Sequence, residues 1–229
     1  MRPRASDGCR RAAWRARPGL FALLAIFGWP ALAAAGSLAV HVAKPDGKPL
    51  AGAVVMVHGP AGTAPAKPAS FVIDQVAKSF TPDLTVMPVG STVTFPNSDV
   101  VSHQVYSFSP AKKFQLPLYR GTPYPPMKFD TAGIVTLGCN IHDDMIAYVV
   151  VTDAAWFGRT GPDGTWAADG LPAGEFRIDV WHPRLREAAQ LVEQKLSLAA
   201  AQNGRAEVVL TRALRPEPLG ARPKSWSDY

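Results

Sequence analysis

Charge, cysteine and long hydrophobic runs are all scarce in this sequence, and each scarcity excludes a class of protein. Charged residues make up 18% of the 229 residues against 47% hydrophobic ones, which is typical of a globular chain and argues against a disordered one. The two cysteines are Cys9 and Cys139. No apolar stretch reaches the roughly 20 residues that a membrane-spanning helix needs. What is present is 22 prolines and 19 glycines, which favour turn-rich β structure over a helical bundle.

The first 35 residues have the layout of an export signal. Residues 1–18 hold six arginines and one acid, Leu20–Trp29 is apolar, and Ala31–Ala35 consists of small residues. This order predicts a signal peptide, residues 1–35, that is cleaved before Gly36. The alternative is a retained anchor, but the stretch from Leu20 to Ala35 is only 16 residues long and is broken by Pro30. We therefore expect a periplasmic protein with no membrane span after cleavage.

Most of the positive charge belongs to this N-terminal segment. Without residues 1–35 the chain has 194 residues with 18 basic and 17 acidic side chains, a net charge of +1 instead of +6. Binding to nucleic acid or to an anionic membrane would need clustered Lys and Arg on the mature part. We expect neither partner.

Cys139 is the one cysteine of the exported part, in a compartment where thiols are normally paired or oxidised. His142 and Met145 follow it three and six residues later, and His103 lies 36 residues upstream. A thiolate, two imidazoles and a thioether form the ligand set of a blue-copper site. Soft sulfur ligands also select copper over calcium or magnesium.

Other roles for Cys139 were weighed against copper binding. It could be a buried inert residue or form an intermolecular disulfide. Zinc prefers four Cys or His ligands in structural sites, and three His or carboxylate ligands plus water in catalytic ones, so it fits this set poorly, although two His and a Cys can hold it. A nucleophilic pair of Cys139 and His142 is the enzymatic alternative, but the two residues between them rarely let the base address the thiol.

The segments Val89–Asn97, Ser102–Val105 and Ala132–Met145 resemble the cupredoxins, with a ligand-loop spacing nearer to amicyanin than to plastocyanin. The resemblance implies one type 1 copper ion and assigns the ligand role to His103, Cys139, His142 and Met145. It implies that the ligands are surrounded by Asn97, Gln104 and Asn140, where Gln104 departs from the family's usual Asn. The stretch His103–Tyr119 also resembles the cupredoxin-containing proteins grouped as methylamine utilisation proteins.

This resemblance implies an electron carrier rather than an enzyme. The histidine of the ligand loop, His142, would be the electron port, and the docking patch around it would consist of Ile141, Asp143, Asp144 and Ile146. A part-apolar, part-acidic patch suits a brief encounter with a soluble periplasmic redox protein, such as a c-type cytochrome or a dehydrogenase. The competing interpretation is a non-redox copper carrier or a module that binds protein or glycan. Further copper centres are not expected, because the remaining histidines (His41, His58 and His182) are scattered and are interpreted as structural or exposed.

The sequence predicts an all-β protein with two parts. Residues 70–153 are expected to form a cupredoxin-like Greek-key β-sandwich. The turn Asp46-Gly47 with its flanks, and the stretch Phe157–Trp181, resemble the carboxypeptidase regulatory-like fold, a small transthyretin-type β-sandwich. We infer that this second sandwich is split into residues 37–58 and 154–212, with the copper domain inserted into it at a loop. The alternative is two domains in tandem.

Several local predictions accompany this division. Residues 37–58 are predicted to be a hairpin, Phe71–Phe80 a strand, and 109–127 a long proline-rich loop. Further strands are predicted at 84–87, 93–95, 105–108, 128–129, 134–139, 147–152 and 177–181, and one near 194–198 through the regulatory-like resemblance. The tail 213–229 is predicted to be disordered.

Overall fold

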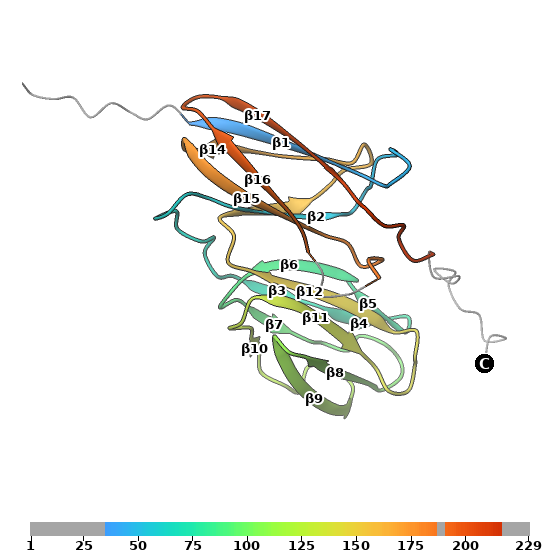
Figure 1. Cartoon of the computed structure of the whole chain (residues 1–229). Coiled ribbons are helices and arrows are strands. Elements are labelled where there is room, and N and C mark those ends of the chain that lie inside the picture. The colour runs from blue at the N-terminus through green and yellow to red at the C-terminus, as the bar shows by residue number, and fades with distance from the viewer. Residues whose placement is uncertain (1–34, 187–190, 217–229) are drawn as a thin grey trace, which may run out of the picture. The chain divides into compact units, whose positions relative to one another are not determined.

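The structure is a computed structural model that describes residues 35–186 and 191–216 (Figure 1). These residues form seventeen β-strands and no α-helix, as the all-β prediction requires. No helix capable of crossing a membrane occurs in the part of the chain so described. The predicted signal peptide falls almost entirely outside the described residues, and so does most of the predicted disordered tail. Within that tail, residues 213–216 are placed, and the Arg215 N–H donates to the Arg184 carbonyl at 2.8 Å.

Strands from the two ends of the described chain share two sheets, which together we call the flanking sandwich. One sheet has the order β14 (Thr165–Leu171), β1 (Gly36–Ala43), β17 (Asn203–Val209). The other has the order β13 (Trp156–Arg159), β2 (Val54–His58), β15 (Gly174–Trp181), β16 (Val192–Leu198). In Figure 1 the blue β1 lies beside the red β17, to which it pairs in parallel.

The residues between these ends form three sheets of their own, which we call the central sandwich. The largest sheet has the order β6 (Leu84–Pro88), β12 (Ile146–Thr152), β11 (Gly133–Gly138), β8 (His103–Ser109), β9 (Lys112–Tyr119). A second has the order β10 (Met127–Lys128), β7 (Thr92–Thr94), β3 (Ser70–Val72), and β4 (Asp74–Val76) pairs with β5 (Ser79–Thr81). Among the described strands, β1 and β2 pair only with strands of the flanking sandwich. The division into an inserted and a split domain stays a prediction.

The predicted hairpin over residues 37–58 is wrong. β1 and β2 lie in different sheets, and each has a strand on both of its sides. β1 alternates between buried and half-buried residues, whereas four of the five residues of β2 are buried. Both strands take their two neighbours from the part of the chain after residue 155 rather than from each other, so the connection between them crosses from one sheet to the other.

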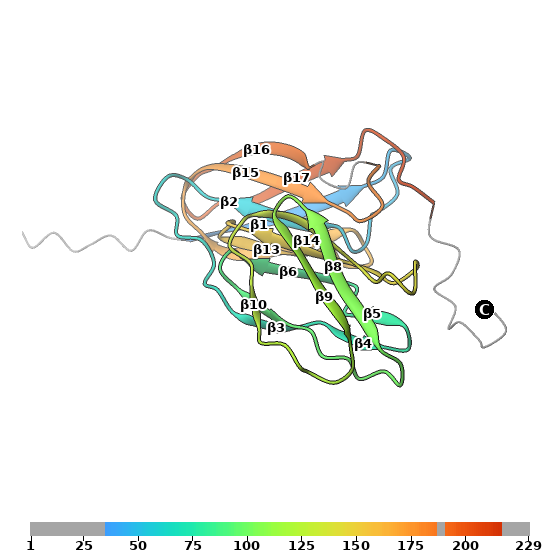
Figure 2. The same ribbon diagram turned by 90° about the horizontal axis from the view of Figure 1, so that it is seen from below.

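The predicted loop at 109–127 is also wrong over Lys112–Tyr119, which forms β9 (Figure 2). This segment was predicted to be a loop because it contains a proline, Pro117. Pro117 lies on the edge strand of the five-stranded sheet, at a bulge where Pro117 and Leu118 both oppose Gln104. A missing N–H costs no ladder bond at such a position, so proline is tolerated there.

The predicted strand Phe71–Phe80 is divided into β3, β4 and β5. β4 and β5 are separated by a tight turn in which Ala77 and Lys78 both have positive φ angles, 49° and 58°. An extended strand cannot contain two consecutive left-handed residues, so the chain reverses there.

Each sandwich has its own apolar core between its sheets. The flanking core contains residues such as Val40, Val57, Ile178 and the fully buried Trp181. The central core includes the two sulfur-bearing residues of the predicted site, Cys139 and Met145. The five-stranded sheet is apolar on both faces, because its outer residues Leu84 and Val150 are buried in the flanking core. An edge-on ring contact joins Tyr148 of this sheet to Trp181 at 5.3 Å.

Candidate metal centre

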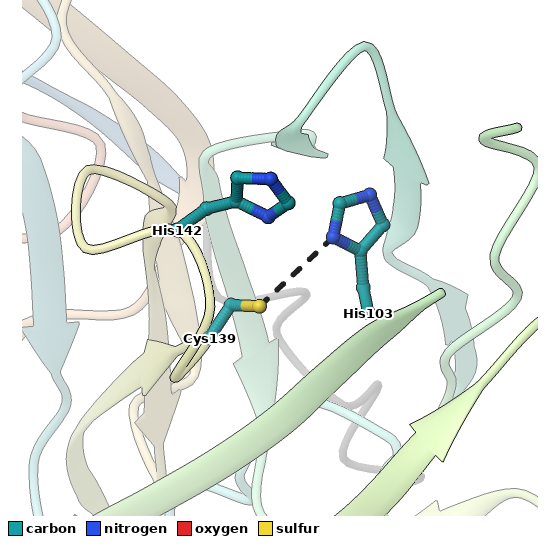
Figure 3. Close-up of side chains that lie close together, drawn as sticks. All are labelled: His103, Cys139 and His142. Atoms are coloured by element: carbon teal, nitrogen blue, oxygen red, sulfur yellow. Dashed lines mark hydrogen bonds between the residues drawn. The ribbon is translucent and has the colours of Figure 1, made fainter. Parts of the chain in front are cut away.

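His103 is the first residue of β8, and its side chain is fully buried. Its Nε2 lies 2.9 Å from Oδ2 of Asp99, and its Nδ1 lies 3.9 Å from Sγ of Cys139 (Figure 3). A carboxylate can only accept, so the proton between them belongs to Nε2, and in the neutral ring the other nitrogen, Nδ1, is the one free to act as a ligand atom. A histidine that is held at one nitrogen by a carboxylate is the usual arrangement of a metal-ligating imidazole.

Asp99 is the functional residue that sequence analysis missed. Its Oδ2 also accepts the Lys78 N–H at 2.7 Å, and its Oδ1 accepts the Val100 N–H at 2.7 Å. Burial of the carboxylate opposes its ionisation, but the bonds from His103, Lys78 and Val100 outweigh burial and lower its pKa below the usual 3.8. The carboxylate is therefore charged at neutral pH. Its place four residues before His103 was the available signal.

The other donors come from the loop between β11 and β12. Cys139 follows the last residue of β11 and is 3% exposed, whereas His142 is half-buried. The Met145 N–H donates to the His142 carbonyl at 2.9 Å, which closes the loop into a tight turn. This turn brings the His142 ring to 4.9 Å from the His103 ring, and in Figure 3 both rings stand over the sulfur of Cys139.

Ligand atoms of His103, Cys139 and His142 lie within 4.8 Å of one another. Within residues 35–186 and 191–216 this is the one group of three or more His, Cys, Asp or Glu residues close enough to hold a metal ion. Bonds of about 2.3 Å to sulfur and 2.0 Å to nitrogen let one ion bridge donors up to about 4.3 Å apart. The 3.9 Å between Cys139 Sγ and His103 Nδ1 falls inside that limit. This donor pair has a separation that a shared ion allows, and a thiolate with two imidazoles is a donor set that suits copper and could also hold zinc.

Met145, the predicted fourth ligand, is 1% exposed and packs in the same core cluster as Cys139. Its backbone is part of the turn that places His142. The side chain is thus on the protein side of the loop, together with the cysteine, rather than in solvent. Its role as a ligand stays a prediction.

Asn97 links two segments around His103, its own stretch up to Val101 and the end of β9. Its Nδ2 donates to the carbonyls of Val101 at 3.0 Å and Tyr119 at 2.7 Å, and its Oδ1 accepts the Asp99 N–H at 3.0 Å. Asn97 therefore holds the segment that carries Asp99 against β9. Of the other residues expected around the ligands, Gln104 is buried opposite the β9 bulge and Asn140 is exposed.

Tyr119 supports the site from the neighbouring strand, where it pairs with His103. Its hydroxyl donates to the Phe95 carbonyl at 2.7 Å and accepts from Nε2 of Gln75 at 2.6 Å. Burial raises the pKa of Tyr119 to about 12, so the phenol stays neutral under ordinary conditions. The strand beside His103 is thus fixed by uncharged hydrogen bonds.

The predicted docking residues are exposed on the ligand loop and at the start of β12. Ile141 and Ile146 are 49% and 48% exposed, and Asp143 and Asp144 are exposed as well. Beside them lies a hollow of about 380 Å³ that sequence analysis did not find, lined by Tyr106, Phe108, Ser109, Thr136, Leu137, Gly138, Cys139, Asp143 and Ile146. Phe108 is 71% exposed there. Tyr106 lies so close to Gly138 that a Cβ on this glycine would come within 2.7 Å of the Tyr106 ring, so a larger residue before Cys139 would have to displace that ring.

Comparisons with known proteins give matches among solved structures alone. No protein-family model and no curated protein matches the chain. A purple cupredoxin from Nitrosopumilus maritimus is 25% identical over 35% of this chain and 98% of its own, with a TM-score of 0.32. A copper-containing nitrite reductase from Thermus scotoductus SA-01 is 23% identical over 49% of this chain and 28% of its own, with a TM-score of 0.35. A reduced amicyanin variant is 21% identical over 43% of this chain and 98% of its own, with a TM-score of 0.33. Because these scores are low, the case for a copper site rests on the residues of the chain itself.

Proposed function

We propose that this protein is an exported type 1 copper protein that carries single electrons between redox partners. The observation that carries the proposal is the convergence of His103, Cys139 and His142 from two distant stretches of sequence. Copper held by a thiolate and two imidazoles can be Cu(I) or Cu(II), so it would supply reversible one-electron chemistry.

The residues of the chain would orient the ligands and exclude water from the site. Asp99 holds the proton on Nε2 of His103 and so keeps Nδ1 available as a ligand atom. His103 and Cys139 are almost completely buried, which excludes water from their side of the site. Met145, on the protein side of the loop, would be the weak fourth ligand. Because most of these groups belong to strands or to the core, little has to move when the charge of the site changes.

Electron exchange would occur through His142, the only one of the three that is not buried. Ile141 and Ile146 offer exposed apolar surface for a short-lived contact, and Asp143 and Asp144 give its rim a negative charge. Such a surface suits a soluble partner with a positively charged rim, for which a c-type cytochrome or a dehydrogenase is the proposed class. The N-terminal signal motif supports a periplasmic location, where both kinds of partner occur.

Copper reconstitution of the mature chain tests the proposal. We expect Cu(II) to produce an intense visible thiolate-to-copper band that disappears on one-electron reduction and returns on oxidation. A protein that binds copper tightly but stays colourless would instead favour the non-redox copper carrier. A protein that binds zinc and no copper would contradict both.

A further inference from the structure

The β4–β5 hairpin has an unusual turn close to the metal centre. Val76 pairs with Ser79, so Ala77 and Lys78 lie outside the ladder, and both have positive φ angles. Turns of two residues with this backbone strongly favour Asn-Gly, because most other side chains are strained at positive φ, whereas glycine and asparagine tolerate it. Strained backbone of this kind is often retained at functional sites, so its surroundings bear on its role.

The turn contacts the carboxylate that holds His103. The Lys78 N–H donates to Asp99 Oδ2 at 2.7 Å, and this is the same oxygen that lies 2.9 Å from Nε2 of His103. Two donors on one oxygen, approaching from different segments, restrict the rotation of the carboxylate. A continuous path of hydrogen bonds therefore runs from the hairpin turn through Asp99 to His103.

The start of the same hairpin is tied to the segment that carries Asp99. Asp74 accepts the N–H and the hydroxyl of Ser98 at 3.1 and 2.7 Å. Gln75 Nε2 donates to the Pro96 carbonyl at 3.0 Å, and the Ser98 N–H donates to the Gln75 carbonyl at 3.1 Å. The hairpin is thus anchored to residues 96–99 at its base and at its turn.

We propose that the β4–β5 hairpin is a positioning element of the metal centre, and that its left-handed turn exists to place the Lys78 N–H on Asp99. The inference rests on the proposed function, because it requires His103 to be a metal ligand. Lys78 acts through its backbone and through Asp99, without touching the metal. The competing explanation is that the turn merely joins two strands.

The flanking sandwich supplies a matched control. Ala201 also has a positive φ angle, 57°, in the turn between β16 and β17. Lys78→Pro and Ala201→Pro each force an incompatible φ on a turn, but only Lys78→Pro removes the donor to Asp99. Ala77→Gly and Ala201→Gly relax the same two turns and keep every donor.

The affinity of the four full-length variants for Cu(I) and Zn(II), measured by competition with chelators, gives the first test. We expect Lys78→Pro to lower both affinities about tenfold, the smaller end of the effect of outer partners on ligands. Ala201→Pro should lower the stability without changing either affinity. Ala77→Gly and Ala201→Gly should raise the stability and leave both affinities unchanged. Equal affinities for Lys78→Pro and Ala201→Pro would overturn the inference.

Amide hydrogen exchange on the unmodified chain is the second test, and it is independent of whether Lys78→Pro folds. Because coupling is reciprocal, a bond that raises metal affinity about tenfold is itself stabilised about tenfold by the metal. We therefore expect Zn(II) to slow exchange at the Lys78 amide by about this factor, and Asp99→Ala to abolish the slowing. Metal binding with no change at Lys78 would refute the hairpin's role alone, whereas no metal binding at all would refute the proposed function.

Discussion

His103 in the central sandwich and His58 in the flanking sandwich both lie against an aspartate. Only His103 belongs to a group of side chains, among the described residues, that could bind a metal ion. His103 gives Nε2 to Asp99 and turns Nδ1 toward Cys139. His58 has Nε2 at 3.0 Å from Asp179 and Nδ1 at 3.5 Å from Asp153, so both of its nitrogens face carboxylates. A histidine–aspartate pair is therefore not by itself the mark of a site. The difference is that the second nitrogen of His103 faces a cluster with a thiol and a second imidazole, whereas that of His58 faces another carboxylate.

The two sandwiches also differ in the polar groups that they bury. The flanking sandwich buries few, and these are Thr160, Asp179 and His182. The central sandwich buries more, and three of these, Gln75, Asn97 and His103, belong to the hydrogen-bond network around the candidate site. Buried polar groups are costly unless they are satisfied. The hydrogen bonds that join the three around His103 indicate that this region is built to hold particular side chains in place.

The largest expected effect comes from removing the sulfur. Cys139→Ser should abolish the visible band and lower copper affinity by more than about 100-fold, because a hydroxyl is a hard, weak ligand where a thiolate is soft. His58→Gln, in the flanking sandwich, should leave the band unchanged. Visible spectra of the two copper-loaded variants make the comparison. A band that survives in Cys139→Ser would remove Cys139 from the site.

The second effect is a pH dependence that belongs to the flanking sandwich. Burial, with Arg184 and Arg159 nearby, lowers the pKa of His182 from 6.5 to about 4. Between these two pKa values the unfolded chain binds a proton at His182 that the folded chain does not bind. The contribution of His182 to the free energy of unfolding is therefore highest above pH 6.5 and decreases as the pH falls toward 4. Over that window the decrease amounts to about 2–3 kcal/mol.

Denaturant unfolding of the metal-free protein at pH 7 and pH 4.5 measures this dependence. His182→Gln should be less stable at pH 7, because the Arg184 N–H loses the Nδ1 that it donates to at 3.1 Å. It should also lose less stability between the two pH values than the unmodified chain. An unchanged slope of stability against pH would show that His182 is not its source.

Replacing Asp99 and Asp179, the aspartates that hold His103 and His58, compares the two histidines most directly. Asp99→Ala should lower copper affinity about 10- to 100-fold, because His103 loses the partner that orients it. Asp179→Ala should leave affinity unchanged and lower stability by about 1–3 kcal/mol, because His58 and Arg177 lose a buried acceptor. Copper competition and denaturant unfolding should be run on both variants. Asp99→Asn, which can still accept the Nε2 proton, should recover part of the affinity.

The smallest effect concerns the docking patch. Asp143→Asn combined with Asp144→Asn should slow electron exchange with a cationic c-type cytochrome by less than about tenfold and flatten its dependence on ionic strength. Asp130→Asn, at an exposed acid that pairs with Lys128, is the control and should change neither. Stopped-flow traces at several salt concentrations distinguish the variants. A salt dependence that persists without both aspartates would place the docking surface elsewhere.

Much of the fold followed from local pattern. The strands at 84–88, 133–138 and 146–152 lie close to their predicted positions because buried β-branched runs are a strong signal. The hairpin at 37–58 and the loop at 109–127 were mispredicted for one shared reason. Sequence proximity favours pairing of neighbours and proline favours loops, whereas sheet order decides which strands are interior and which are edges. Sheet order is a property of distant contacts.

The sequence by itself indicated the candidate site, because Cys139 is followed at spacings of three and six by His142 and Met145, a pattern that leaves few interpretations. It also determined the all-β class, through turn residues and short apolar runs. Only the tertiary structure decided that Asp99 holds His103, that Lys78 holds Asp99, and that Tyr106 and Phe108 border the loop. These contacts join segments that are neighbours across sheets and turns rather than along the chain, and no local pattern of residues specifies which nitrogen of a histidine is left to face a sulfur.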